Sequence, residues 1–367
     1  MSITQKQRLV IKVGSALIAP TACGCSEKYL RNIADFIHRI RQQGQQVVLV
    51  SSGSVAAGRY LFNNQQPNMA LKKAMAAAGQ TEMMAMWDKL LGLPVAQILL
   101  THADLCNRER YISVKDTIES LLDNGIMPIV NENDTVTSEE LKVGDNDNLA
   151  AMTAAAVDAD ALLICTDVDG LYDKNPHKFS DAQLLKDVTR ITPDIFAMAG
   201  GAISATGTGG MQTKIEAAQK ATAQGIDTYI INGFKAQSFH YLLEGQNPGT
   251  HFVACESPLS PSQHWMTHTT KECGEVIIDE HKDHFAQNSP VITSDDIVEV
   301  KGEFSVGDTI LLRSCDGTRM AKATANYSSC LLNYVKQQPS IPELVGSLHP
   351  QHNSIISKKH FALLENV

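Results

Sequence analysis

Carboxylates and amides gather in two short segments of this 367-residue chain. Asn131-Glu132-Asn133-Asp134 directly follows the apolar run 126–130, and Asp145-Asn146-Asp147-Asn148 opens an Ala-rich helical pattern over 149–157. In an open α/β sheet, ligands bind beyond the carboxyl ends of the strands, and helix N-termini attract anions. Turn and N-cap residues are the alternative interpretation, but a cap needs only one such residue. We therefore predict a ligand site at these segments.

Two lysines stand where they would face a phosphate group. Lys12 lies in the apolar stretch 9–15, where a buried charge is costly unless an anion awaits it. Lys214 follows a Gly-rich segment from residue 205 and stands on the first turn of a helical pattern that runs to 224. Glycines there allow backbone N–H groups to point at phosphates, although the spacing is neither the Walker nor the GxGxxG form. A snorkelling surface lysine and a flexible linker are the alternatives.

A third junction, Ser51-Ser52-Gly53-Ser54, ends the apolar run 46–50. Small residues continue over 55–58 and allow close approach of the backbone to a ligand. Ordinary turn preference is the alternative reason for the glycine.

Apolar runs alternate with helical patterns along the first two thirds of the chain. This alternation predicts an α/β fold with a doubly wound, mainly parallel sheet sandwiched by helices. The expected strands are 9–15, 46–50, 95–100, 126–130, 161–165 and 228–231, and the expected helices are 29–43, 69–91, 113–123, 149–157 and 215–224.

The pattern changes after residue 248, where periodicity fades and a Ser-Pro-rich stretch covers 257–262. Short strands are then expected at 275–279, 297–300, 309–313 and 320–325, which indicates a small β-rich domain. We predict a catalytic domain over 1–255, a linker over 256–274 and the β-rich domain over 275–367. Residues 271–367 carry nine Lys and Arg against thirteen Asp and Glu, a balance that argues against nucleic-acid binding.

Composition is ordinary for a soluble globular protein, with 43% apolar residues, 19% charged residues and a net charge of −9. The polar start lacks the apolar core of a secretory signal, and no apolar run reaches the roughly 18 residues of a membrane span. The eight cysteines are scattered, which favours free thiols in a reducing cytoplasm. Cys23-Gly24-Cys25 as a redox or metal pair is the weaker alternative.

These motifs, in this order, resemble the amino acid kinase family, and within it the enzymes that phosphorylate L-glutamate. The resemblance covers nearly the whole chain, and its C-terminal part is similar to a PUA domain. The matching stretches are Val10-Ile11-Lys12-Val13-Gly14-Ser15, Val50 with the residues through Gly58, Asn131-Glu132-Asn133-Asp134 with Lys142 through Asn148, and Gly207 through Lys214.

The resemblance implies transfer of the γ-phosphoryl group of ATP to the side-chain carboxylate of L-glutamate, with Mg²⁺, as the first step of proline synthesis. It also implies feedback inhibition by L-proline and assembly into dimers or tetramers, and it allows contact with the next enzyme of the pathway. No membrane partner is expected.

Site residues follow from the resemblance position by position. The implied glutamate contacts are Ser52, Asp134 and Asn146, and we expect Asp134 to face the ammonium while the other two hold carboxylates. The catalytic group is Lys12, Lys214 and Asp147, where Asp147 either orients the lysines or holds the metal; no metal ligand is assigned. The implied ATP contacts are Lys12, Thr166, Asp167, Thr208, Gly209, Gly210, Met211, Gln212, Thr213 and Lys214.

The expected chemistry needs no base. A glutamate side chain has a pKa of about 4.3, so the nucleophile is already ionised at neutral pH. The difficulty is repulsion between this anion and a triphosphate, which positioning and positive charge must overcome. Lys12 and Lys214 would supply that charge.

The C-terminal part departs from the family pattern at Asp279-Glu280-His281 and over 289–297, while 302–308 and 326–329 match. Two other functions remain open. One is a kinase of the same fold acting on N-acetylglutamate, aspartate or a nucleotide, and the other is an RNA-binding regulator acting through the PUA-like domain.

Overall fold

The computed structural model describes residues 3–62, 67–137, 146–176, 178–199, 210–279, 292–337 and 354–364. The chain divides into two compact units, Met1–Pro258 and Leu259–Val367. The linker over 256–274 and the domain limits around it stay predictions. In the described part of the chain, no helix is both long and apolar enough to span a membrane.

An eight-stranded sheet forms the centre of the first unit, in the order β3-β4-β2-β1-β5-β7-β8-β6. Every pairing is parallel except β7 with β8, which is antiparallel. The mainly parallel sheet expected from the sequence is therefore confirmed. Its strands are β1 Arg8–Val13, β2 Gln46–Ser51, β3 Val95–Leu100, β4 Met127–Glu132, β5 Ala161–Thr166, β6 Asp187–Val188, β7 Asp227–Asn232 and β8 Thr250–Phe252.

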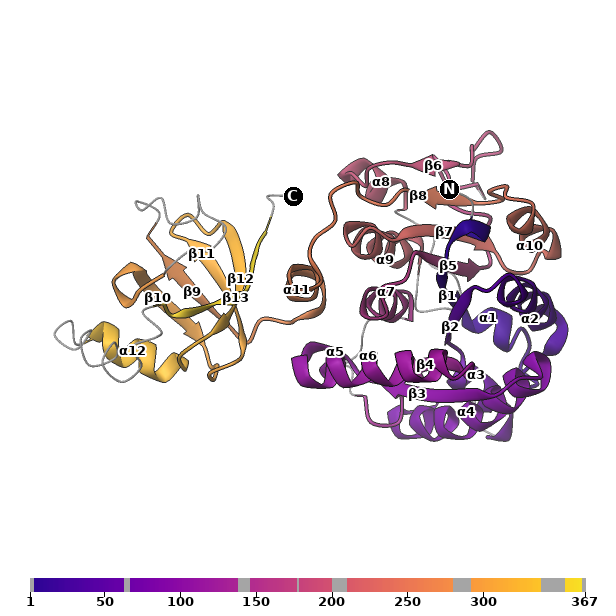
Figure 1. The fold of residues 1–367 in the computed structure, drawn as a ribbon, viewed down its shortest axis with the longest axis horizontal. Coiled ribbons are helices and arrows are strands. Elements are labelled where there is room, and N and C mark those ends of the chain that lie inside the picture. Colours follow the sequence, from indigo (N-terminus) through magenta and orange to yellow (C-terminus); the bar gives the residue numbers. More distant parts are fainter. Residues whose placement is uncertain are drawn as a thin grey trace. The chain divides into compact units, whose positions relative to one another are not determined.

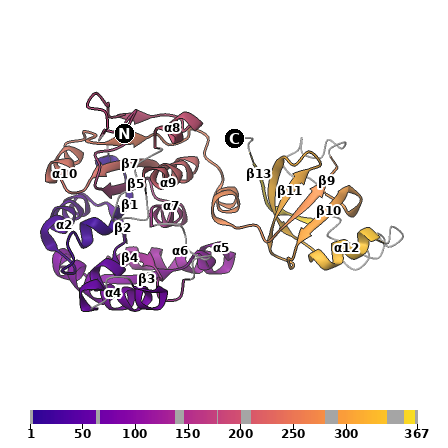
Figure 2. The same ribbon diagram turned by 180° about the vertical axis from the view of Figure 1, so that it is seen from behind.

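Helices cover both faces of this sheet, with α2 and α10 on one side and α7 and α9 on the other (Figures 1 and 2). The helices are α1 Ser15–Ile18, α2 Glu27–Gln42, α3 Ser54–Gly58, α4 Met69–Leu91, α5 His102–Cys106, α6 Arg108–Asp123, α7 Asn146–Ala156, α8 Pro193–Met198, α9 Met211–Ala223 and α10 Ala236–Leu243. Short 3₁₀ turns occupy Ile3–Gln5 and Arg59–Leu61.

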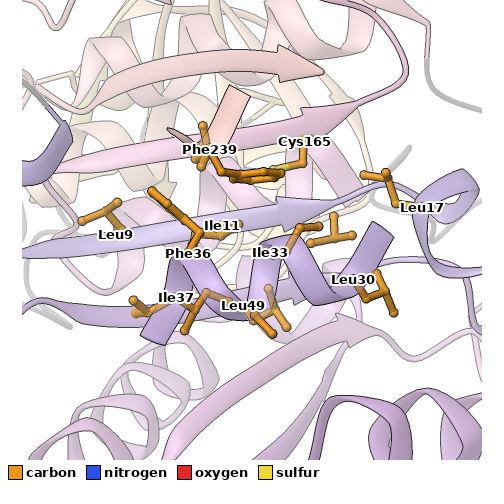
Figure 3. Close-up of a cluster of buried hydrophobic side chains, with 14 of the residues drawn as sticks. Leu9, Ile11, Leu17, Leu30, Ile33, Phe36, Ile37, Leu49, Cys165 and Phe239 are labelled. Carbon is orange, nitrogen blue, oxygen red and sulfur yellow. The ribbon is translucent and has the colours of Figure 1, made fainter. Parts of the chain in front are cut away.

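The alternation of side chains along β1 decides which way Lys12 points. Leu9, Ile11 and Val13 belong to the buried cluster that packs against α2, where Ile33 and Phe36 lie close to the strand (Figure 3). Because successive strand residues point to opposite faces, Lys12 lies on the other face, toward α7 and α9. One face of β1 thus builds the core, and the other delivers a charge to the site.

Two glycines let α3 and α4 touch through their backbones. A Cβ on Gly58 would lie 2.1 Å from the Met75 carbonyl oxygen, and a Cβ on Gly79 would lie 1.9 Å from the Ser54 carbonyl oxygen. No side chain fits at those distances, so the two helices can pack this closely only with glycine at both positions. This contact fixes the position of Ser54 in α3 and of Gln80, which follows Gly79 in α4.

The second unit contains a five-stranded sheet in the order β10-β9-β11-β12-β13, so the β-rich pattern expected from the sequence is confirmed. Val276, Ile310, Leu312 and Ala323 are among its core residues. The strands are β9 Gly274–Ile278, β10 Ile297–Gly302, β11 Thr309–Ser314, β12 Arg319–Ala325 and β13 Ile356–Leu363. Helical segments are α11 Pro261–His264, the π-helix Trp265–Thr269, the 3₁₀ turn Ser294–Asp296 and α12 Ser329–Gln337.

Candidate active site

The register of the parallel strands brings the predicted residues to one edge of the sheet. Lys12 lies opposite Val50 of β2 and Ile164 of β5, and Val50 in turn lies opposite Val130 of β4. The carboxyl ends of these four strands therefore coincide. Ser52, the segment after Val130 and Thr166 all follow at that edge.

A buried carboxylate joins the two lysines. Lys12 Nζ lies 2.6 Å from Asp147 Oδ1, and Lys214 Nζ lies 3.0 Å from Asp147 Oδ2. Asp147 is fully buried, and the two lysines are 6% and 5% exposed, so the interpretation of Lys12 as a surface lysine is wrong. Three elements, β1, α7 and α9, thus meet at one carboxylate.

Lys12, Asp147 and Lys214 form a triad whose net charge favours the binding of an anion. Burial alone would raise the pKa of Asp147, but the charges and hydrogen bonds of Lys12 and Lys214 outweigh burial and hold that pKa well below its usual range. Two ammonium groups and one carboxylate leave one net positive charge in a poorly solvated place. A phosphoryl group is an anion that such a place would bind strongly.

The first turn of α9 closes this side of the site. The Thr213 hydroxyl lies 3.2 Å from Asp147 Oδ2 and 2.9 Å from the Gly210 carbonyl oxygen. Gly210 is the extended N-cap residue of the helix and supplies no side-chain cap, and the first N–H groups of an α-helix have no acceptor within the helix. This end of α9 suits a phosphate.

Amides and hydroxyls form a second cluster beside the triad. Asn146 Nδ2 lies 2.9 Å from Ser52 Oγ and 3.0 Å from Asn131 Oδ1, and the Ser54 hydroxyl donates to Asp134 Oδ2 at 2.7 Å. The three residues expected to contact glutamate thus gather around the turn after β2. Gly53, with φ of +98°, makes that turn possible.

The expected nucleotide contacts are only partly visible. Thr166 ends β5 and lies 3.1 Å, through its hydroxyl, from the carboxylate of exposed Asp167. Met211 and Gln212 lie on the first turn of α9 with Thr213 and Lys214. Thr208 and Gly209, together with 138–145 and hence Lys142 and Asp145, lie outside the described residues.

Three residues of the cluster, Gln80, Asn131 and Ser54, had no assigned role in the predicted site, although Asn131 stood in the first predicted segment. Gln80 of α4 accepts a hydrogen bond from Asn131 Nδ2 at 2.8 Å, and Ser54 holds Asp134. Ser54 stood in a recognised motif without an assigned role. Gln80 gave no signal of its own, because its importance comes from a contact between residues 51 positions apart.

The donor set does not resemble a preformed metal cage. Within the part of the chain that the structure describes, no group of three or more His, Cys, Asp or Glu side chains could hold a metal ion. Both oxygens of Asp147 face lysines, which is the wrong environment for a cation ligand. Asp147 therefore fits the orienting role better than the metal-binding one.

The fold and the site define an α/β protein that gathers positive charge at the carboxyl edge of a parallel sheet. The amino acid kinase family model matches residues 7–232, and the chain belongs to that family. Those residues include every strand and helix that contributes to the site.

The chain is similar to three curated relatives over most of its length. It is 57% identical to "Glutamate 5-kinase 1" of Pseudoalteromonas translucida, with 98% of each chain covered. It is 50% identical to "Glutamate 5-kinase" of Idiomarina loihiensis, with 90% of this chain and 91% of the relative covered. The corresponding enzyme of Salinibacter ruber is 44% identical, with 91% of both covered.

Proposed function

We propose that this protein transfers the γ-phosphoryl group of ATP to the side-chain carboxylate of L-glutamate and forms L-glutamyl 5-phosphate, the first step of proline biosynthesis. The relatives at 57%, 50% and 44% identity are all named as enzymes of this activity, and the chain spans nearly their full length. The structural observation that carries the proposal is the buried triad of Lys12, Asp147 and Lys214, which adjoins the Ser52–Asn146 cluster.

The two halves of the site suit the two reactants. In the triad, Asp147 holds both ammonium groups in place, so that Lys12 and Lys214 can stabilise charge on the transferred phosphoryl oxygens. Ser52, Asp134 and Asn146 would bind glutamate, whose zwitterionic head needs both donors and acceptors. Because the attacking carboxylate is already ionised, positioning and charge are sufficient.

ATP would lie along the carboxyl ends of β5 and β7 and the start of α9. Thr166 and Asp167 would contact the nucleotide, and the α9 turn from Gly210 to Lys214 would bind its phosphates; Thr208 and Gly209 are assigned by resemblance alone. Mg²⁺ would neutralise the β- and γ-phosphates, held mainly by phosphate oxygens and water, as this ion commonly is.

Several wider expectations belong to the same proposal. Feedback inhibition by L-proline, a dimeric or tetrameric assembly and contact with the next pathway enzyme rest on the resemblance. A cytoplasmic location is supported by the eight cysteines, which all lie among the described residues and form no disulfide bond there. The PUA-like second unit carries no assigned function here, and its acidic balance weighs against RNA.

A hydroxylamine-trapping assay tests the proposal. With ATP and Mg²⁺, L-glutamate should give a hydroxamate, because hydroxylamine captures an acyl phosphate. N-acetylglutamate and aspartate are tested in the same way, and uridine monophosphate, whose phosphorylation forms no acyl phosphate, is tested by ADP release. Each should react at less than about a hundredth of the glutamate rate, since the site would pair charged groups that N-acetylglutamate and uridine monophosphate lack and that the shorter aspartate cannot reach together. A better rate with any of these acceptors would move the protein to another branch of the family.

A further inference from the structure

Hydrogen bonds join three side-chain amides, those of Gln80, Asn131 and Asn146, next to the residues expected to bind glutamate. Asn131 Nδ2 donates to Gln80 Oε1 at 2.8 Å, and Asn146 Nδ2 donates to Asn131 Oδ1 at 3.0 Å. Asn131 is fully buried, and Gln80 is 8% exposed. The three amides connect α4, β4 and α7, which are far apart in sequence.

One backbone N–H determines which amide groups act as donors and which act as acceptors along these three side chains. The Glu132 N–H donates to Asn131 Oδ1 at 2.9 Å, and a backbone N–H can only donate. The oxygen of Asn131 must therefore face Glu132, and its amino group must face Gln80. It follows that Gln80 presents its oxygen to Asn131 and that Asn146 presents its amino group.

This direction leaves an acceptor at the substrate end. Both hydrogens of Asn146 Nδ2 are engaged, one by Asn131 Oδ1 and the other by Ser52 Oγ at 2.9 Å. Asn146 Oδ1 is buried and makes no hydrogen bond to a described residue. A buried acceptor without a partner is costly, so this oxygen is placed to receive a donor from a ligand.

We propose that Gln80 and Asn131 are positioning residues that fix Asn146 with its oxygen toward the substrate, where it accepts a hydrogen bond from the α-ammonium group of the amino acid. This inference rests on the proposed function and deepens it. It reverses the role expected for Asn146 from the sequence, because no N–H of its side chain is left for a carboxylate.

The neighbouring groups complete the same pattern. Asp134, held by Ser54 in the turn that also carries Ser52, adds a negative charge for the ammonium. Ser52 Oγ accepts from Asn146, so its own hydrogen is directed elsewhere and suits a substrate carboxylate. Ammonium recognition thus falls to Asn146 and Asp134, and carboxylate recognition falls to Ser52.

Two substrate analogues separate the two roles of Asn146. Glutarate keeps both carboxylates and lacks the ammonium, whereas 4-aminobutyrate keeps the ammonium and lacks the α-carboxylate. Calorimetry on the full chain would compare Asn146→Ala with wild type. Affinity for glutamate and 4-aminobutyrate should fall about tenfold or more, and affinity for glutarate should change less than about twofold. An equal loss of affinity for glutarate would overturn the proposal. An unchanged affinity for 4-aminobutyrate would overturn it as well, so each analogue is an independent test.

A matched pair of substitutions at Gln80 tests the hydrogen-bond direction along the three amides, with glutamate as the substrate. Gln80→Glu keeps an acceptor for Asn131, and Gln80→Met keeps the size but removes it. We expect the KM for glutamate to stay within about threefold of wild type in the first variant and to rise about tenfold in the second, with kcat nearly constant in both. The opposite order would mean that Gln80 donates and that the hydrogen bonds run the other way. Absence of glutamate phosphorylation in wild type would instead refute the proposed function.

Discussion

Asp147 is the residue on which both active-site lysines depend. It is fully buried between two cations, so replacing it with asparagine would leave two buried positive charges with no anion. We expect Asp147→Asn to lower kcat by about 100-fold or more and to destabilise the first unit by about 3–5 kcal/mol. Steady-state kinetics and urea unfolding measure the two effects. The exposed Asp88→Asn on α4 is the control and should stay within about 0.5 kcal/mol.

The destabilisation caused by Asp147→Asn should depend on pH, because it comes from the ion pairs of Asp147 with Lys12 and Lys214. The pKa of Asp147 is lower in the folded protein than in the unfolded chain, so its charge stabilises the fold above the unfolded value of about 4. This contribution is lost as the pH falls below that value. The stability gap between wild type and Asp147→Asn should therefore shrink below about pH 4 and stay constant from pH 5 to 7. A gap independent of pH would contradict the ion-pair account.

Residue types near the site were largely predictable, but their pairings were not. Lys12 stood out because its charge interrupted an apolar run, and Asp147 stood out because it belongs to a dense cluster of carboxylates and amides; both are local signals. Gln80 lies inside a helical Ala-rich stretch, where only the approach of β4 gives it a partner. Contacts of that kind depend on tertiary packing, which periodicity does not encode.

At the scale of elements, the α3–α4 contact positions the acceptor side of the site. Gly79→Ala would force a methyl group against the Ser54 carbonyl oxygen and Gly58. We expect a loss of about 1–3 kcal/mol and a raised KM for glutamate, since Ser54 and Gln80 would both shift. Ala77→Ser, on the exposed side of α4, is the matched control. An unchanged KM in a folded Gly79→Ala protein would show that this contact does not position the site.

Element boundaries show where sequence patterns lose information. The helix expected from 113 begins at Arg108, because Asn107 caps it by accepting from the Arg110 N–H at 3.1 Å. The helix expected from 149 is already helical at Asn146. In both helices, polar residues whose sequence is typical of a loop form the first helical turn. In α7 that turn carries the buried Asp147.

At the scale of the whole molecule, every site residue that the structure describes belongs to the first unit. A chain ending at Pro258 should therefore keep glutamate phosphorylation within about threefold of the full chain's kcat, provided that it folds. Circular dichroism would establish folding before the kinetics. A folded but inactive fragment would show that the second unit, with its five-stranded sheet, is required for the reaction.

Transfer of the phosphoryl group to the glutamate side chain is the central claim, and an oxygen label tests it most directly. L-glutamate carrying ¹⁸O in its side-chain carboxylate is incubated with ATP, Mg²⁺ and hydroxylamine. The ¹⁸O content of the released phosphate is then measured by mass spectrometry. Attack at the acyl carbon leaves the bridging oxygen on phosphate, so each phosphate should carry one ¹⁸O. Unlabelled phosphate would mean that ATP is hydrolysed by water, and the assignment of the site as a glutamate kinase would be wrong.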